Sequence, residues 1–128
     1  MKVLIDTNAY SALGRGDPHV RAVVEFADEV VVSTIVLGEL HAGFSLGTRK
    51  EKNRRELDEF LRKPGVTVLS PSRSIAERYG ELIRVLRDAG TPLPTNDIWI
   101  AATALESGSR VLSMDAHFGD VPGILTVL

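Results

Sequence analysis

The sequence contains no cysteine and only three histidines among its 128 residues. The missing thiols exclude disulfide scaffolds, thiol nucleophiles, zinc ribbons and iron–sulfur clusters. The scattered histidines argue against a zinc site built on imidazoles. A basic excess is also missing, because 15 Lys and Arg stand against 17 Asp and Glu, for a net charge of −2. Any contact with nucleic acid must therefore be local or assisted by a metal ion.

Long hydrophobic runs are absent too. The longest nearly apolar run extends from Ile98 to Leu105, far short of the roughly 20 residues that span a bilayer. No signal-peptide pattern precedes Asp6. We therefore expect a soluble, cytoplasmic protein without membrane contact. With 44% hydrophobic and 25% charged residues, the composition is that of one ordinary globular domain.

The periodicity of apolar residues predicts alternating strands and helices. Strands are expected at 2–5, 30–32, 66–69, 110–113 and 124–127, and helices at 20–27, 35–44, 49–63, 75–89 and 97–106. The strand segments are continuous apolar runs, which is typical of strands buried on both faces. Thr34 is the expected N-cap of the second helix, and Asn96 or Thr95 that of the last. The alternation favours an α/β domain with a mainly parallel sheet.

Four acidic residues fall where these expected strands end or helices begin. Asp6 ends the first strand, Glu39 follows the second, Asp97 opens the last helix, and Asp115 lies just past the fourth strand. A parallel sheet places them at one edge, where α/β proteins bind ligands. Four carboxylates in one cleft repel one another unless a cation is present, and Mg²⁺ or Mn²⁺ resolves that repulsion with oxygen ligands. Such a site supports phosphodiester hydrolysis by metal-activated water.

Each acid also has a purely structural interpretation. Asp6 and Asp115 can cap helices, and Asp97 suits the first turn of a helix. Glu39 is the most informative, because its helix is expected to be well buried and Glu is seldom buried without a partner. The joint pattern favours a site over four independent structural roles.

Four segments, 3–8, 33–40, 94–102 and 111–118, carry a family resemblance. In order and spacing they resemble the PIN-domain ribonucleases, most closely the VapC-type toxins of bacterial and archaeal toxin–antitoxin pairs. The resemblance covers essentially the whole chain. It implies a single PIN domain over 1–128, a three-layer α/β/α fold with a central, mainly parallel sheet of about five strands.

The resemblance also implies a metal-dependent endoribonuclease that hydrolyses RNA with Mg²⁺ or Mn²⁺. The family's four acidic positions fall on Asp6, Glu39, Asp97 and Asp115, with Asp6 and Asp97 as metal ligands. The residues expected to orient these carboxylates through hydrogen bonds are Asn8, Asn96 and Ser113. Ser113 stands where many relatives have Thr, and the hydroxyl is kept.

Two protein partners follow from the same resemblance: a second copy of the chain in a homodimer, and a cognate antitoxin. The antitoxin tail is expected in an apolar groove beside the site, with a basic residue facing the acids. The groove would involve the early helices, including Val20, Val23 and Val24, and the helix of Glu39. Without the resemblance, core packing explains these apolar faces.

Other classes of protein fit less well. A receiver domain needs an Asp after the third strand and a late Lys, but Leu69-Ser70-Pro71 follows that strand and no Lys follows Lys63. An aspartyl-phosphate phosphatase typically has a second Asp where this chain has Asn8. A nuclease acting on DNA and a catalytically quiet nucleic-acid-binding module remain as alternatives.

The segment 49–63 carries seven basic and four acidic residues. It can steer RNA phosphates, or it can be a solvated helix with pairs such as Glu51–Arg55, and we favour the solvated helix. Arg15 lies on an expected loop from which it can touch substrate. Trp99 is expected in the core or an interface, although it can stack on a base. His41 and His117 are expected to be structural or exposed.

Overall fold

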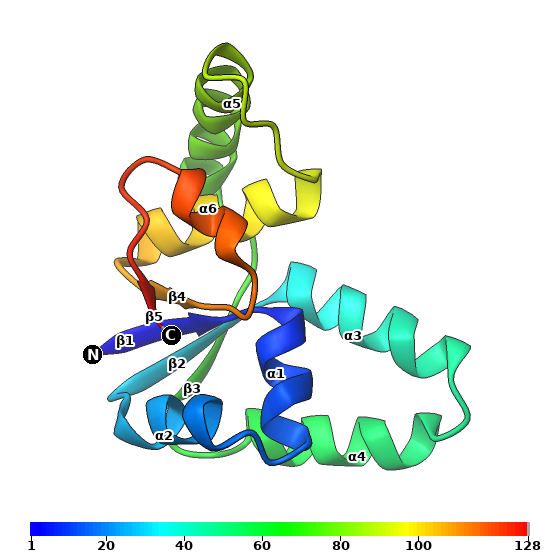
Figure 1. Ribbon diagram of the computed structural model, residues 1–128. Coiled ribbons are helices and arrows are strands. Elements are labelled where there is room, and N and C mark those ends of the chain that lie inside the picture. Colours follow the sequence, from blue (N-terminus) through cyan, green and yellow to red (C-terminus); the bar gives the residue numbers. More distant parts are fainter. Residues whose placement is uncertain (128) are drawn as a thin grey trace.

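The computed structural model describes residues 1–127, and their fold is a parallel sheet between two groups of helices (Figure 1). The elements, in chain order, are β1 (Lys2–Ile5), α1 (Thr7–Gly14), α2 (Pro18–Phe26), β2 (Glu29–Ser33), α3 (Thr34–Leu46), α4 (Lys50–Leu61), β3 (Val66–Leu69), α5 (Arg73–Asp88), α6 (Thr95–Ser107), β4 (Arg110–Leu112), the 3₁₀ helix η1 (Ala116–Asp120) and β5 (Thr126–Val127). The expected α/β architecture is confirmed.

The strand order is β3-β2-β1-β4-β5, and every neighbouring pair is parallel. Leu4 in the central strand pairs with Val31 on one side and Val111 on the other. The inner strands β1 and β2 are buried as the apolar runs predict. The prediction is wrong for β3, where the neighbouring residues Thr67 and Val68, which point to opposite faces of the sheet, are both exposed because β3 forms an edge of the sheet.

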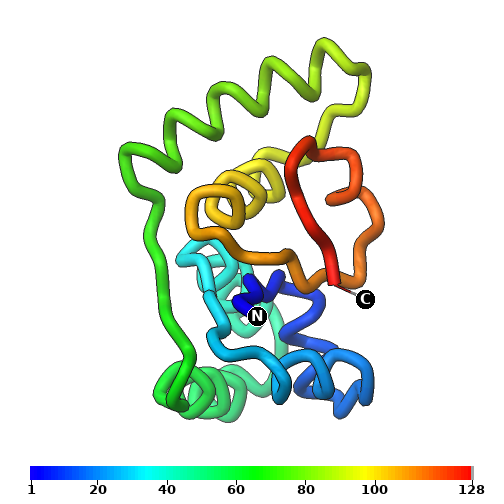
Figure 2. The backbone as a smooth tube through the Cα atoms, turned by 90° about the vertical axis from the view of Figure 1, so that its left-hand side faces the viewer, coloured from blue at the N-terminus to red at the C-terminus, as the bar shows by residue number. Residues whose placement is uncertain are grey.

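The connections explain the three layers. The chain moves from β1 through β2 to β3 in one direction, and α1 to α4 therefore cover one face under the right-handed crossover rule. It then returns past β1 to β4, which places α5 and α6 on the opposite face (Figure 1). In the view turned by 90°, α6 lies between the sheet and the outer helix α5 (Figure 2). The strand order thus reverses between β1 and β4.

The core is built from the buried strands and from one side of each helix. Trp99 of α6 stacks on Tyr79 of α5, with ring centroids 4.0 Å apart and an interplanar angle of 16°. Trp99 also packs against the core, which confirms its expected core role. Within residues 1–127, no helix combines the length and apolar character needed to cross a membrane.

Several local predictions are wrong. The helix α1 is not predicted, because it is only eight residues long and buries just the small side chains Ala9 and Ala12. The cap of α3 is Ser33, whose hydroxyl accepts a hydrogen bond from the backbone N–H of Ile35, and not Thr34. The last helix, α6, begins at Thr95, after Pro94, and has no side-chain cap.

The helices expected to form an apolar groove are packed differently from one another. Val20 of α2 is completely buried in the core and cannot line a groove, whereas Val23 and Val24 are half-buried. The helix α3 is less buried than predicted, with only Val36 and Leu40 fully covered. The physical reason is that α3 starts at the sheet and then projects away from it (Figure 1).

Candidate acidic active site

Asp6 lies at the point where the strand order reverses, directly after β1. Its backbone N–H donates to the carbonyl of Leu112 at the end of β4, 3.1 Å away, so the residue is tied to both strands. Its carboxylate caps α1 by accepting from the N–H of Ala9 at 2.8 Å. The other carboxylate oxygen accepts a hydrogen bond from the Ser113 hydroxyl. Asp6 is therefore both a helix cap and a fixed, 5% exposed carboxylate.

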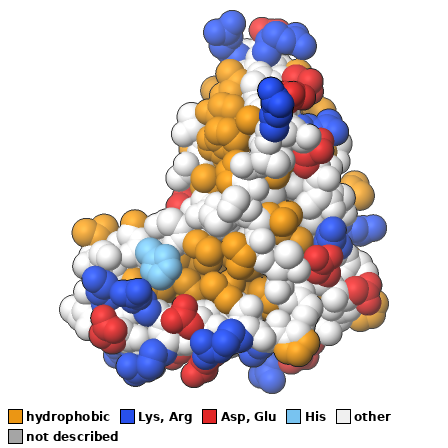
Figure 3. Space-filling model, turned by 180° about the vertical axis from the view of Figure 1, so that it is seen from behind, with side chains coloured by type: hydrophobic (Ala, Val, Ile, Leu, Met, Phe, Trp, Pro, Cys, Tyr) orange, Lys and Arg blue, Asp and Glu red, His pale blue; other side chains and the backbone are white. Residues whose placement is uncertain are grey.

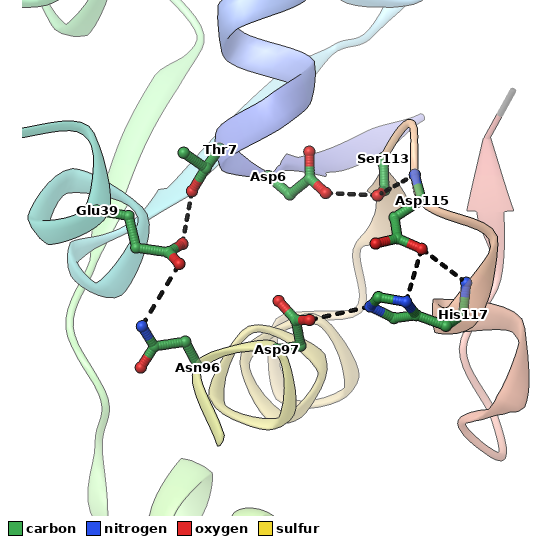
Figure 4. Close-up of polar contacts among 8 residues, drawn as sticks. All are labelled: Asp6, Thr7, Glu39, Asn96, Asp97, Ser113, Asp115 and His117. Carbon is green, nitrogen blue, oxygen red and sulfur yellow. Dashed lines mark hydrogen bonds and ion pairs between the residues drawn. The ribbon is translucent and has the colours of Figure 1, made fainter. Parts of the chain in front are cut away.

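Glu39 points towards the same edge from the second turn of α3 (Figure 4). The Thr7 hydroxyl donates to one of its carboxylate oxygens at 2.6 Å. The Asn96 amide donates to the other at 3.4 Å. Thr7 belongs to α1 and Asn96 to α6, so hydrogen bonds from both sides of the sheet hold Glu39 in place.

Asp97 and Asp115 are joined by a histidine. His117 Nε2 lies 3.0 Å from Asp97 Oδ2, and its Nδ1 lies 2.7 Å from Asp115 Oδ1. Asp115 also accepts from the backbone N–H of His117, as the cap of η1. Its own backbone N–H donates to the Ser113 hydroxyl at 2.9 Å. Ser113 therefore connects Asp6 to Asp115, and His117 connects Asp115 to Asp97 (Figure 4).

All four acids line one cavity of about 130 Å³. Burial raises the pKa of Asp6, and the charges of Asp97 and Asp115 raise it further. The hydrogen bonds from Ser113 and from the N–H of Ala9 act in the opposite direction. The net upward direction means that ionised Asp6 lacks sufficient positive charge nearby.

The donor chemistry of this pocket fits a hard divalent cation. Its acidic side chains are all carboxylates, which suit Mg²⁺ and Mn²⁺, and a bound cation would offset the charges of Asp97 and Asp115, which together with burial raise the pKa of Asp6. The cavity has room for an ion that keeps some of its waters. Within the described residues, no three Asp, Glu or His side chains already form a metal-ligand group.

The four acids that the sequence predicts to lie together do so, but two of their hydrogen-bond partners, Thr7 and His117, were not expected. Asp6, Glu39, Asp97 and Asp115 share the cavity, and Ser113 and Asn96 make the expected kind of contact. Asn8 lines the cavity, but within residues 1–127 its side chain has no hydrogen bond to any of the four acids.

His117 was expected to be structural or exposed, and the turn of η1 places its partly buried ring between two acids, a contact that this expectation did not include. Thr7 was not considered as a partner of Glu39. The contact of His117 with the acids had a signal in the sequence, because His117 follows Asp115 by only two residues. The contact of Thr7 with Glu39 had no such signal, because these residues are 32 positions apart.

The fold and this pocket together define a parallel α/β protein with a carboxylate site suited to a divalent cation. The sequence matches the family model of the PIN domain over residues 3–124. The chain therefore belongs to the PIN-domain family.

Curated relatives extend over nearly the whole chain. Ribonuclease VapC4 from Mycobacterium tuberculosis is 30% identical over 125 residues, which cover 96% of this chain and 93% of that protein. The plasmid stability protein StbB from Pseudomonas syringae pv. tomato is 32% identical over 130 residues, covering 95% and 94%. These proteins are full-length matches and not shared fragments.

Solved structures show the same fold. The structure of VapBC2 from Rickettsia felis bound to a DNA fragment from their promoter superimposes with a TM-score of 0.87 and 26% identity, covering 98% of this chain and 97% of that chain. The DNA-bound VapBC from Salmonella typhimurium gives a TM-score of 0.86, also at 26% identity, with coverage of 98% and 96%. The likeness includes the complete sheet and its helices.

Proposed function

We propose that this chain is a metal-dependent endoribonuclease, a single PIN domain over residues 1–128 that hydrolyses RNA phosphodiester bonds. The observation that carries the proposal is the convergence of four carboxylates, from four separate elements, on one small cavity. That arrangement is costly without a cation, as the raised pKa of Asp6 indicates. Relatives that carry the name ribonuclease support the choice of reaction.

Asp6 and Asp97 would hold the metal, Mg²⁺ or Mn²⁺, and Glu39 and Asp115 would complete its surroundings. When bound, the ion supplies an activated water and stabilises the charge that develops on the phosphate. Asp6 suits direct ligation because it is fixed by Ser113 and by the N-terminus of α1. Asp97 faces it from the start of α6 (Figure 4).

The surrounding residues keep these carboxylates oriented. Thr7 and Asn96 hold Glu39 by one hydrogen bond on each oxygen. His117 fixes Asp97 and Asp115 relative to each other. Asn8, which is exposed at the cavity wall, would contact the substrate or a water rather than an acid.

Two partners belong to the proposal. One is a cognate antitoxin, which is supported by structural neighbours at 26% identity that are named VapBC2, VapBC and VapBC-1. The other is a second copy of this chain in a homodimer. In this assembly the chain is the toxin, and the antitoxin controls access to the acids.

The test is cleavage of a mixed transfer and ribosomal RNA pool by the purified protein without antitoxin. Reactions contain Mg²⁺, Mn²⁺ or EDTA, and Asp6→Asn serves as the control against contaminating nucleases. We expect fragments that require metal and disappear with Asp6→Asn. Cleavage that survives both treatments would refute the proposal. Cleavage of a matched single-stranded DNA at the same rate would favour the DNA-nuclease alternative, and metal-dependent RNA binding without cleavage would favour the quiet binding module.

A further inference from the structure

A second cavity, of about 350 Å³, lies between α1 and the hairpin formed by α3 and α4. Its wall contains three cations, Arg15, Arg49 and Lys52, together with the aromatic residues Tyr10 and Phe44. We call this cavity the basic cleft. In the view from behind, Lys and Arg side chains gather on the lobe that α3 and α4 form (Figure 3).

The charge of the basic cleft is largely uncompensated. Within residues 1–127, neither Arg15 nor Arg49 has a salt-bridge partner, and both are exposed. Lys52 lies 3.8 Å from Glu56, an exposed pair that contributes little. This pair takes the place of the predicted Glu51–Arg55 pair. Three cations therefore face one carboxylate in a chain whose net charge is −2.

Two helices, α1 and α3, begin near the acidic site and extend to the basic cleft. Asp6 caps α1, and the turn that carries Glu39 belongs to α3. Along α1, Asn8, Ser11 and Arg15 follow one another at helical spacing, from the acidic cavity to the basic cleft. The seven helical steps from Asn8 to Arg15 span about 10 Å, the axial length of about three stacked nucleotides.

Small side chains lie on α3 and α1 between the two cavities. Ala42 and Gly43 lie one turn after Glu39 on the same side of α3, and both are exposed. Ser11 and Gly14 line the cleft from α1. No bulky side chain from these positions therefore separates the four acids from the three cations.

The two aromatic rings give the cleft an apolar wall. Tyr10 packs edge-on against Phe60, with centroids 5.4 Å apart and an angle of 68°. Phe44 packs in the same way against His41 at 5.7 Å. Cations combined with held aromatic rings are the features by which proteins bind single-stranded nucleic acid without reading its sequence.

We propose that the basic cleft binds the phosphates of the RNA strand about three nucleotides from the bond that the acidic site cuts. This inference rests on the proposed function for the identity of the strand. Arg15 and Arg49 are positioning residues: they hold the strand across α1, and they do not touch the reacting phosphate. The cations Arg54 and Arg55 of α4 lie outside the cleft and have no part in this binding.

The decisive experiment compares two double variants that remove the same charge. Arg15→Ala/Arg49→Ala empties the cleft of its unpaired cations, and Arg54→Ala/Arg55→Ala is the matched control on α4. Binding of a fluorescent single-stranded RNA of about ten nucleotides is measured by anisotropy in EDTA, where no metal supports cleavage. Thermal melting verifies that both variants fold.

We expect the cleft variant to raise Kd about tenfold and to reduce the slope of log Kd against log salt by about 1.4, the value for two lost phosphate contacts on a single strand. The control should bind like the parent, and Arg15→Lys/Arg49→Lys should restore most of the affinity. Equal losses in the cleft and control variants, an unchanged cleft variant, or no RNA binding by the parent would each overturn the proposal.

Cleavage kinetics separate this proposal from the proposed function. With an RNA that the parent cuts, the cleft variant should raise KM about tenfold with a nearly unchanged kcat, because the cleft does not touch the reacting atoms. If the parent binds RNA through the cleft but cuts none, the proposed function fails and the cleft proposal stands. If the cleft variant keeps its RNA affinity and KM but loses affinity for the antitoxin, the cleft is a protein contact and the proposal is wrong.

Discussion

The two edges of the sheet carry cavities of opposite character. The carboxyl edge has the small acidic cavity of about 130 Å³. The amino edge, where β2 and β3 begin, has a cavity of about 460 Å³ lined in part by Val24, Ala27 and Phe60. Most charged groups at the amino edge are paired, since Arg21 contacts Glu25 at 2.9 Å and the N-terminal amine binds Asp28, while Lys63 forms no salt bridge within residues 1–127. At the carboxyl edge, four carboxylates line one cavity, and His117 contacts only two of them, Asp97 and Asp115.

From this difference we infer that the charge of a cavity, and not its volume, marks the proposed functional edge. The larger cavity follows from imperfect packing between short helices and strand starts, and its ion pairs cost the fold little. In the acidic cavity, burial and then the charges of Asp97 and Asp115 disfavour the ionised form of Asp6 and raise its pKa. In folded proteins, buried clusters of like charge with perturbed pKa values are found most often at functional sites, where a bound ligand can neutralise the charge.

The largest expected effect comes from removing one charge at the carboxyl edge. Asp6→Asn or Asp97→Asn should reduce RNA cleavage about 10³-fold or more, because each removes a proposed metal ligand. Initial rates in Mg²⁺ and Mn²⁺ measure the loss, and circular dichroism verifies the fold. A variant that retains more than about a tenth of the activity would show that this carboxylate does not hold the metal.

The next effect concerns the hydroxyl that joins two acids. Ser113→Ala should weaken Mn²⁺ binding about 10- to 100-fold, because Asp6 loses a hydrogen bond that orients its carboxylate and lowers its pKa. Calorimetric titration with Mn²⁺ measures the affinity. Ser113→Thr is the matched control and should bind the metal like the parent. Equal losses in both variants would point to packing and not to the hydroxyl.

A smaller effect is expected on stability without metal. Burial and two neighbouring carboxylates raise the pKa of Asp6 above its usual 3.8, so the folded state binds the proton more tightly than the unfolded chain. The free energy of unfolding therefore falls as pH rises through 3.8 and then through the higher pKa of the folded state. Asp6→Asn does not show this fall in the free energy of unfolding, because the Asn side chain does not titrate.

Thermal melting in EDTA across this pH range tests the sign. The Tm advantage of Asp6→Asn should grow as pH rises and then level off. Mg²⁺ should raise the Tm of the parent at neutral pH and leave the variant unchanged, because only the parent offers the full ligand set. A Tm difference that shifts in favour of the parent as pH rises would contradict the assigned direction.

The smallest effect is expected at the amino edge. Val24→Ala enlarges the larger cavity by removing part of a half-buried side chain. It should cost about 1 kcal/mol of stability and leave RNA cleavage by the antitoxin-free protein unchanged. Denaturant unfolding and initial rates measure the two quantities. A loss of cleavage comparable to that of Asp6→Asn would remove the functional distinction between the edges.

The sequence alone determined the alternation of strands and helices and the four acids at their ends. Each of these signals is local: apolar runs identify β1 and β2, and a polar residue marks the point where each run stops. Because parallel strands end at the same edge, the positions of Asp6 and Asp115 after their strands were enough to predict their meeting. The short helix α1 escaped prediction because two buried alanines make a weak pattern.

Only the tertiary structure decided which side chains hold those acids. The contacts of Thr7 with Glu39 and of His117 with Asp97 join residues 32 and 20 positions apart, and their geometry depends on how α1, α3, α6 and η1 pack. The basic cleft depends on the same packing, since Arg15 and Arg49 come from different helices. Local patterns specify where a chain turns polar, but hydrogen bonds and charge clusters depend on distances that exist only after the elements have packed.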